Sequence, residues 1–402
     1  MKFRLFAKLT KITVSLCLTL ALMLPLALPT RAQSPDDPVV PISENASPSV
    51  AFDVNCPSAI LMEASTGKIL YEKNADQPLP PASVTKIMTL LLVMEAIDDG
   101  RLKMTDMVTA SAHAASMGGS QIYLKEGEQM SAEDMIKSVV ISSANDAAVA
   151  LAEHIAGSEA SFVAQMNQKA KDLGMNNTHF ENTNGLDDTA EHHVTSARDI
   201  ALMSQALIAH EKILQYSSIW VDTIRGGAFG LTNTNRLVRY YQGCNGLKTG
   251  STQKAGFCIS ATACRDGMTL ICVIMGAESR DIRNATATQL LDWGFANYGL
   301  YTYEGKDLGQ VQVMGGERAY IHVSHQTFTC VLPKSRLATV DVNIRMPEVL
   351  SAPVQKNENV GLIEFCSEGE IIGQVPICAG ETSLKMSFWQ VFWRMVRGFL
   401  LG

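Results

Sequence analysis

The pattern of apolar and polar positions divides the chain into a part that mixes strands with helices and a later part made of strands. Two short apolar-rich runs, 59–64 and 68–73, are joined by Ser65-Thr66-Gly67, which predicts a β-hairpin. The next apolar run ends near Gly100 and is hydrophobic on nearly every side, so we expect a buried helix there.

Further helices and strands complete the first part. Helix-start and helix-stop signals predict helices over 131–140, 146–155, 158–173 and 196–210, with a break at 141–145. The pattern then predicts strands at 221–224, 247–249, 257–263 and 269–275, followed by a helix over 285–295. This order favours an α+β domain over residues 51–300, with a mainly antiparallel sheet and helices grouped on it.

From Leu308 onward the pattern is that of strands alone. Apolar runs separated by glycines and charges occur at 311–314, 319–323, 327–332, 338–345, 360–365 and 370–375. We therefore expect a small β-sandwich over residues 305–383.

The first 50 residues have the character of an export signal followed by a lead-in. A basic start precedes an apolar run over 12–28, and a small residue lies just before Gln33, which predicts a signal peptide over 1–32. An N-terminal membrane anchor is the alternative. Residues 33–50 are rich in proline, serine and aspartate, as in a flexible lead-in. The prediction is an exported protein.

The last residues, 386–402, predict an amphipathic helix. Aromatic and aliphatic side chains cover most of its surface, and Gln390, Arg394 and Arg397 form a narrow polar stripe. Such a helix is too short to cross a membrane but suits its surface. Docking on the protein's own core or on a partner is the alternative.

The charge and the cysteine and histidine spacing argue against nucleic-acid binding and against a metal site. The 402 residues carry a formal net charge of -7, and there is no basic patch interleaved with aromatics, so nucleic acid is not the expected ligand. Eight cysteines follow the predicted signal peptide, and their pairing stays open because several lie in apolar strand patterns. No cysteine or histidine spacing predicts a metal site, and no cofactor is expected.

Ser83 and Lys86 are the first candidates for chemistry. They lie three residues apart in the first turn of the buried helix that follows Pro80-Pro81, so their side chains can touch. A buried lysine loses charge stabilisation, its pKa falls, and it can then accept the proton of the serine hydroxyl. Backbone N–H groups of the first turn can stabilise an oxyanion. A capped helix with a surface lysine is the alternative.

Two further motifs supply partners. Ser143-Ala144-Asn145 interrupts a helical pattern, and its hydroxyl and amide can relay protons and bind a peptide group. Lys248-Thr249-Gly250 begins a strand segment that offers a positive charge and a hydroxyl. Gly250 has no side chain, which lets another backbone approach the strand edge, as for a substrate peptide bound as an extra strand.

These three motifs, in this order, closely resemble the low-molecular-mass penicillin-binding proteins, the serine-type D-alanyl-D-alanine carboxypeptidases. The resemblance covers nearly all of the chain after residue 32 and includes segments 180–187, 196–199, 246–250 and 291–295. It implies a β-lactamase/transpeptidase-like domain. It also implies peptidoglycan stem peptides as substrates, β-lactam antibiotics as inhibitors, and a position at the outer face of the bacterial cell membrane.

The resemblance also assigns the reacting groups. It implies that Ser83 attacks the carbonyl between the last two D-alanines, that Lys86 accepts the Ser83 proton, and that Ser143 passes a proton towards the leaving amine. Asn145 is implied to bind the substrate amide and to order the lysines.

The remaining residues are implied to bind the substrate. Lys248 sets the local potential, and Thr249 and Arg283 bind the terminal carboxylate. Gly250 belongs to the same motif, and the N–H groups of Ser83 and Ser251 match the oxyanion hole. Some relatives carry histidine at the position of Ser251.

Two rival functions share part of this pattern. A β-lactamase has the same three motifs but also needs a glutamate that activates water, and the surroundings of Glu181 do not have the expected spacing. A non-catalytic cell-wall binding or sensor protein would not need all three motifs intact. The sequence therefore favours a carboxypeptidase over a β-lactamase and over a non-catalytic binding protein.

Overall fold

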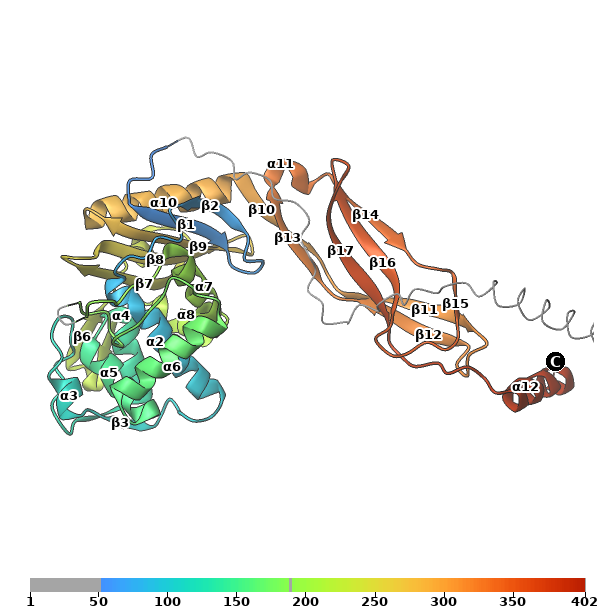
Figure 1. The fold of residues 1–402 in the computed structure, drawn as a ribbon, viewed down its shortest axis with the longest axis horizontal. Coiled ribbons are helices and arrows are strands. Elements are labelled where there is room, and N and C mark those ends of the chain that lie inside the picture. The colour runs from blue at the N-terminus through green and yellow to red at the C-terminus, as the bar shows by residue number, and fades with distance from the viewer. Residues whose placement is uncertain (1–51, 188–189, 402) are drawn as a thin grey trace, which may run out of the picture.

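A computed structural model describes residues 52–187 and 190–401. The predicted signal peptide, and the lead-in over 33–50, lie outside the described residues. Figure 1 shows two bodies along the chain: a mixed body of helices and one sheet, and a narrower body of long strands with helix α12 at its far end. This confirms the predicted α+β domain followed by an all-β domain and a C-terminal helix.

The first body is built on a five-stranded sheet in the order β2-β1-β9-β8-β7. All four neighbouring pairs are antiparallel, as the sequence predicted. The strands are β1 (Ser58–Glu63), β2 (Ile69–Lys73), β7 (Cys244–Thr252), β8 (Gly256–Arg265) and β9 (Met268–Ala277). β7 lies at one edge, which leaves its outer side available to other parts of the protein.

Helices cover both faces of this sheet (Figure 1). Side chains alternate between the faces along a strand, so Ile60 and Met62 of β1 join one core and Ala59 and Leu61 join the other. The first core packs against a group of helices: α2 (Lys86–Asp98), α4 (Ala132–Ile141), α5 (Asn145–Ala156), α6 (Glu159–Asp172) and α7 (Ala197–Ile208). The second packs against α10 (Arg280–Asn297).

Serine side chains fix where several helices begin. Ser131, Ser158, Ser196 and Ser279 each accept a hydrogen bond from the backbone N–H three residues later, which supplies a partner that the first turn lacks. The cap at Ser279 starts α10 at Arg280, five residues before the predicted start at 285. The prediction missed this first turn because its residues are polar and give no apolar pattern.

Shorter elements connect these parts. They are the 3₁₀ turns η1 (Ala82–Thr85) and η2 (Arg225–Gly227), helices α3 (Ala112–Ala115), α8 (Lys212–Ser217) and α9 (Leu237–Tyr240), and strands β3 (Met107–Thr109), β4 (Gln129–Ser131), β5 (Val221–Ile224) and β6 (Phe229–Thr232). Of these strands, the apolar pattern predicted only β5.

The second body contains a six-stranded sheet in the order β14-β16-β17-β12-β11-β15 and a two-stranded ribbon of β10 and β13. Phe328 of the ribbon stacks on Phe365 of the sheet at 4.1 Å between ring centroids, so the ribbon covers the sheet's core. The elements are β10 (Tyr298–Tyr303), β11 (Lys306–Met314), β12 (Tyr320–His325), β13 (Phe328–Pro333), α11 (Lys334–Leu337), β14 (Val340–Arg345), β15 (Val349–Ser351), β16 (Asn359–Ser367) and β17 (Glu370–Ala379).

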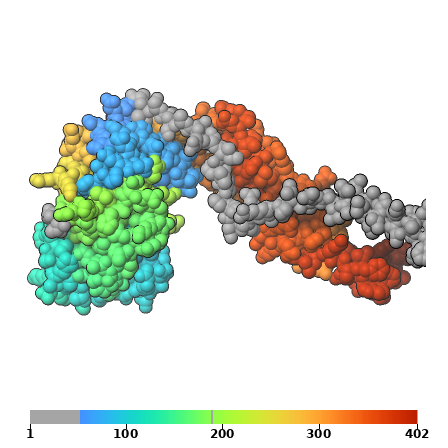
Figure 2. All heavy atoms as spheres, viewed as in Figure 1, coloured from blue at the N-terminus to red at the C-terminus, as the bar shows by residue number. Residues whose placement is uncertain are grey.

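The ribbon also joins the two bodies. Val331 of β13 belongs to the second core of the first body, and its carbonyl oxygen accepts a 3.2 Å hydrogen bond from Nζ of Lys68. Figure 2 shows the two bodies as separate lobes, with α12 (Phe388–Leu401) at the end of the second lobe that is remote from the first. The eight cysteines of the described residues are free thiols.

Candidate active site

Ser83 and Lys86 are brought together by a tight turn at the start of the buried helix. The predicted first helical turn is the 3₁₀ turn η1, which continues directly into α2. Nζ of Lys86 lies 2.9 Å from Oγ of Ser83. Ser83 is half-buried, whereas Lys86 is fully buried, so the lysine faces the hydroxyl from inside the protein.

The surroundings of Lys86 favour its neutral form. Burial lowers its pKa well below 10.5, the nearby cation of Lys248 lowers it further, and the carboxylate of Asp146 opposes both. Nζ of Lys86 also donates to Oδ1 of Asn145 at 2.6 Å and to the carbonyl oxygen of Asn184 at 2.8 Å. A neutral amine has two hydrogens for these acceptors, which leaves its lone pair for the Ser83 hydroxyl.

Ser143 lies in the loop that separates α4 from α5 and Asn145 follows at its end, so the helical pattern is interrupted where the sequence predicted. Ser143 is 3% exposed and has φ 65°, a left-handed backbone conformation that is costly for a serine. Asn145 begins α5, and its Nδ2 donates to the carbonyl oxygen of Gly118 at 2.7 Å. This contact fixes the amide so that its oxygen points at Lys86.

Lys248 lies on the edge strand β7 and completes a second serine–lysine pair. Its Nζ donates to Oγ of Ser143 at 2.8 Å and to the carbonyl oxygen of Thr249 at 2.9 Å. Burial, together with the nearby cation of Arg283, lowers the pKa of Lys248 to about 7. The two pairs are linked, because Asn145, two residues after Ser143, contacts Lys86.

Gly250 brings β7 against the turn that carries Ser83. A Cβ atom at this position would lie 2.7 Å from the backbone nitrogen of Ser83 and 2.9 Å from the carbonyl oxygen of Pro81. Another backbone thus does approach Gly250, as the sequence interpretation expected, and it is the protein's own turn; the binding of a substrate peptide as an extra strand stays a prediction. Ser251, the next residue, is exposed.

Thr249 and Arg283 are both nearly buried, and each has a polar partner. Oγ1 of Thr249 donates to Oγ1 of Thr234 at 2.8 Å. Arg283, on α10, donates to Oδ1 of Asn284 at 2.8 and 3.1 Å and to the carbonyl oxygen of Cys258 at 3.3 Å. Among the described residues no carboxylate pairs with Arg283, so its charge is not neutralised by an ion pair.

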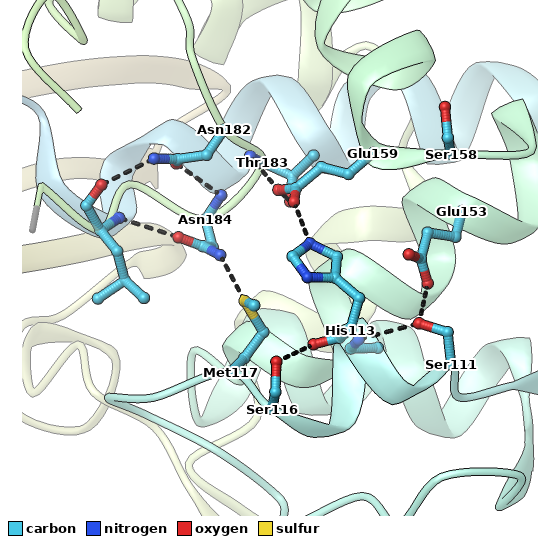
Figure 3. A network of polar contacts seen from close by, with 12 residues as sticks. Ser111, His113, Ser116, Met117, Glu153, Ser158, Glu159, Asn182, Thr183 and Asn184 are labelled. Carbon is cyan, nitrogen blue, oxygen red and sulfur yellow. Dashed lines mark hydrogen bonds and ion pairs between the residues drawn. The ribbon is translucent and has the colours of Figure 1, made fainter. Parts of the chain in front are cut away.

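The sequence reasoning missed the role of the loop that supplies the carbonyl oxygen of Asn184. Figure 3 shows this loop fastened by polar contacts to Glu159 of α6 and to Met117, which follows α3. Glu159 Oε1 accepts from the N–H and the hydroxyl of Thr183, while its Oε2 contacts Nε2 of His113. The loop resembled a family segment, but a backbone carbonyl leaves no residue-type signal.

Asp146 was missed as well, although it lies beside Asn145. It is 1% exposed, and its carboxylate accepts hydrogen bonds from the N–H groups of Ile122, Leu124 and Ala147. The side chain thereby holds segment 120–124 against the start of α5, next to the pair formed by Asn145 and Lys86.

Comparisons with known proteins agree with this arrangement. Residues 43–279 match the family model described as D-alanyl-D-alanine carboxypeptidase, and residues 301–384 match the model of the penicillin-binding protein 5 C-terminal domain. The chain is 42% identical to D-alanyl-D-alanine carboxypeptidase DacF of Bacillus subtilis over 82% of this chain and 86% of that protein.

Solved structures point the same way. Penicillin-binding protein 5 from Haemophilus influenzae superposes with a TM-score of 0.74 at 29% identity, over 84% of this chain and all of that one. Penicillin-binding protein D2 from Listeria monocytogenes, solved with ampicillin bound, is 33% identical with a TM-score of 0.57, over 61% of this chain and all of that one. The chain therefore belongs to the D-alanyl-D-alanine carboxypeptidase family of penicillin-binding proteins, as a serine-type D-Ala-D-Ala carboxypeptidase.

Proposed function

We propose that this protein removes the terminal D-alanine from peptidoglycan stem peptides through an acyl-enzyme on Ser83. The observation that carries the proposal is the linked arrangement of two serine–lysine pairs around one turn. In the first pair the lysine is buried beside the nucleophile, where its pKa is lowered, and in the second it lies beside a strained loop serine.

The first half of the reaction forms the acyl-enzyme. Neutral Lys86 accepts the proton of the Ser83 hydroxyl while Oγ of Ser83 bonds to the carbonyl carbon of the penultimate D-alanine. The N–H groups of Ser83 and Ser251 hold the oxyanion that results. The C–N bond then breaks, Ser143 delivers a proton to the nitrogen, and D-alanine leaves. Lys86 then returns the proton that it took from Ser83 to Oγ of Ser143, which restores the Ser143 hydroxyl.

The second half of the reaction restores the enzyme. Water attacks the ester carbonyl from the side that D-alanine has left, and one of the two lysine–serine pairs accepts a proton of the water. The ester bond to Ser83 breaks, Oγ of Ser83 regains a proton, and the shortened peptide leaves with a new carboxylate. A β-lactam acylates Ser83 in the same way, but its leaving group stays attached and hinders the approach of water.

The terminal carboxylate of the substrate is bound by the cationic side of the site. Lys248 and Arg283 supply positive charge, and the hydroxyl of Thr249 supplies a donor. Arg283 suits this role because its present partners are neutral oxygens, which a carboxylate can outcompete. Gly250 keeps β7 close enough for these groups to reach the peptide that Ser83 attacks.

The test is a product assay on a defined pentapeptide, combined with mass spectrometry after exposure to benzylpenicillin. We expect one D-alanine per peptide and an adduct on Ser83, and neither from Ser83→Ala. Ser142→Ala is the matched control, since among the described residues the hydroxyl of Ser142 donates to the carbonyl oxygen of Ser138 in the preceding helix α4 and not to the site. Unchanged D-alanine release by Ser83→Ala would refute the proposal, and rapid steady-state penicillin turnover would favour a β-lactamase.

We also propose that α12 binds the membrane surface and that the protein acts at the outer face of the bacterial cell membrane. Two residues of the polar stripe of α12 contact its own β domain: Gln390 donates to Glu317 at 2.8 Å, and Arg394 donates to the carbonyl oxygen of Gly316 at 3.4 Å. The apolar side chains point away and are exposed, among them Phe388, Trp389, Trp393, Phe399 and Leu400. Such a face suits the boundary of headgroups and acyl chains.

Within the described residues, no helix combines the length and apolar character needed for a membrane span. Surface binding is tested by sedimentation with vesicles of phosphatidylglycerol and phosphatidylcholine. We expect the full chain to sediment with the vesicles, and the variant Trp389→Ser/Trp393→Ser to remain in solution with unchanged D-alanine release. Equal sedimentation of both would refute the role of α12.

In this proposal each part of the chain has its own role. Residues 51–300 form the catalytic domain, residues 305–383 form the β domain that separates it from the membrane, and residues 386–402 form the membrane-associating helix. An export signal over 1–32 and a lead-in over 33–50 complete the scheme.

A further inference from the structure

A buried histidine outside the three motifs is connected to the nucleophile's turn. His193 is 5% exposed and lies at the far end of the loop that contacts Lys86. Segment 193–195 is fixed beside η1, because Thr195 and Leu79 exchange backbone hydrogen bonds of 2.8 and 3.0 Å just before Pro80. The ring of Phe180 packs edge-on against His193 at 5.6 Å between centroids.

The polar contacts of His193 define which nitrogen carries its proton. The backbone N–H of Glu181 donates to Nδ1 at 3.0 Å, and an N–H group cannot accept, so Nδ1 bears no hydrogen. The neutral ring therefore has its proton on Nε2, which donates to Oγ1 of Thr85 at 2.8 Å. The Thr85 hydroxyl in turn donates to the carbonyl oxygen of Ala82 at 2.9 Å.

This chain of donors ends on a strained residue beside the nucleophile. Ala82 has φ 49°, in the left-handed region that an alanine adopts only at a cost, and it directly precedes Ser83. Gly185 lies against the same carbonyl so closely that a Cβ atom there would be 1.9 Å from the Ala82 oxygen. The surroundings thus hold Ala82 in a conformation that it would not keep alone.

We propose that His193 is a positioning residue that, through the hydroxyl of Thr85, holds the Ala82 carbonyl and thereby aims Ser83 at the substrate. The proposal rests on the proposed function, because it concerns the nucleophile assigned there. His193 does not touch the reacting atoms. It acts by keeping the strained turn in one orientation, so its loss misplaces the hydroxyl without removing the site.

The positioning role requires the neutral form of His193. The titratable groups that face it are Glu181, His179 and Asp187, and burial outweighs their charges, so the ring stays neutral at physiological pH. A second proton would have to enter at Nδ1, directly against the N–H of Glu181, and would break the chain of donors. Acid pH should therefore mimic the loss of His193.

The test is the acylation rate constant with a chromogenic β-lactam, measured together with kcat and KM on the pentapeptide. We expect His193→Phe, which keeps an aromatic ring but neither nitrogen, to lower acylation and kcat by about 10- to 100-fold with little change in KM. His193→Gln should recover most of this loss, because its amide offers both an acceptor and a donor. The exposed neighbour His192→Phe is the matched control and should behave as wild type.

A second route tests the same chain of donors if His193→Phe does not fold. Thr85→Val removes the bridging hydroxyl while keeping the side-chain shape, and it should slow acylation to a similar extent. Where His193→Phe does fold, combining it with Thr85→Val should add little further loss, since both variants break one connection. Independent, additive losses would overturn the inference.

The two proposals fail separately. Wild-type acylation by His193→Phe and Thr85→Val, with none by Ser83→Ala, would overturn the positioning role and leave the carboxypeptidase mechanism intact. Continued acylation of Ser83→Ala would overturn the mechanism whatever the His193 variants do.

Discussion

Nζ of Lys86 lies 2.9 Å from Oγ of Ser83, while its two other polar partners are oxygens that can only accept. A protonated lysine would have to donate to all three oxygens. A neutral one gives its two hydrogens to Asn145 and Asn184 and keeps its lone pair for the Ser83 hydroxyl. The three oxygens could also accept from a protonated lysine, so the geometry is compatible with the base form, and burial and the cation of Lys248, which lower the pKa, are what favour it.

The first prediction concerns the identity of this base. Lys86→Arg should lower the acylation rate by about 10²- to 10⁴-fold, because a guanidinium does not lose its proton in this pH range. Non-covalent binding of substrate should persist, since Lys86 itself does not contact the carboxylate in the proposed mechanism. Stopped-flow acylation measures the rate, and a variant that retains more than about a tenth of it would contradict the base assignment.

The second prediction concerns pH. Acylation should rise with pH through the folded pKa of Lys86, because only the neutral amine accepts a proton. Lys248, whose pKa is lowered to about 7, loses its charge above that pH and attracts the substrate carboxylate less. We therefore expect kcat/KM to fall again on the alkaline side, with apparent pKa values that belong to the coupled pair.

Lys248→Arg is the control for that alkaline fall. A guanidinium keeps its charge, so the fall should move to higher pH while the acid side stays in place. An alkaline fall that is unchanged in Lys248→Arg would mean that another group causes it.

The third prediction uses the contact between Gly250 and the nucleophile's turn. Gly250→Ala puts a methyl group 2.7 Å from the backbone nitrogen of Ser83, so either β7 or the turn must move. Acylation should fall by at least about tenfold, because a small displacement of the nucleophile has a large effect on rate. Gly230→Ala is the control, since a Cβ atom at that position has no atom within 4 Å. Equal rates for the two variants would contradict the packing argument.

These contacts also show which parts of the site a sequence can predict. Ser83 and Lys86 are three residues apart, so helical geometry alone brings them together. Lys86 and Asn184 are 98 residues apart, and Thr85 and His193 are 108 apart. Both of these contacts depend on a loop without periodicity, and one of them uses a backbone oxygen that any residue could provide.

The fold shows the same division. Strands β1, β8 and β9 follow their apolar patterns closely, because both faces of the sheet are buried and the pattern must persist along each strand. Strand β15 has only three residues and a single buried side chain, so its position depends on pairing with β11 and leaves no pattern. Helix α10 likewise begins in polar residues that only the Ser279 cap explains.

The fourth prediction links His193 to stability. Burial lowers its pKa from 6.5 to about 4, so between these pH values the unfolded chain binds a proton that the folded protein does not. The free energy of unfolding should therefore rise with pH across this window, by roughly 3 kcal/mol at about 1.4 kcal/mol per pKa unit. His193→Gln should lose this part of the slope in urea unfolding series, and His192→Gln should keep it. Identical slopes for wild type and His193→Gln would contradict the prediction.

The last prediction concerns Asp146, whose carboxylate holds segment 120–124 and also acts on Lys86. In Asp146→Asn one acceptor oxygen becomes an amide that faces a backbone N–H group, so the free energy of unfolding should fall by about 1–3 kcal/mol. The negative charge of Asp146 raises the pKa of Lys86, so its removal should lower that pKa further and move the acid side of the acylation profile to lower pH. The exposed Asp172→Asn should change neither quantity. A loss of stability without the pH shift would mean that Asp146 holds the segment but does not tune the base, because the two effects arise from separate properties of one carboxylate: its acceptor oxygens and its charge.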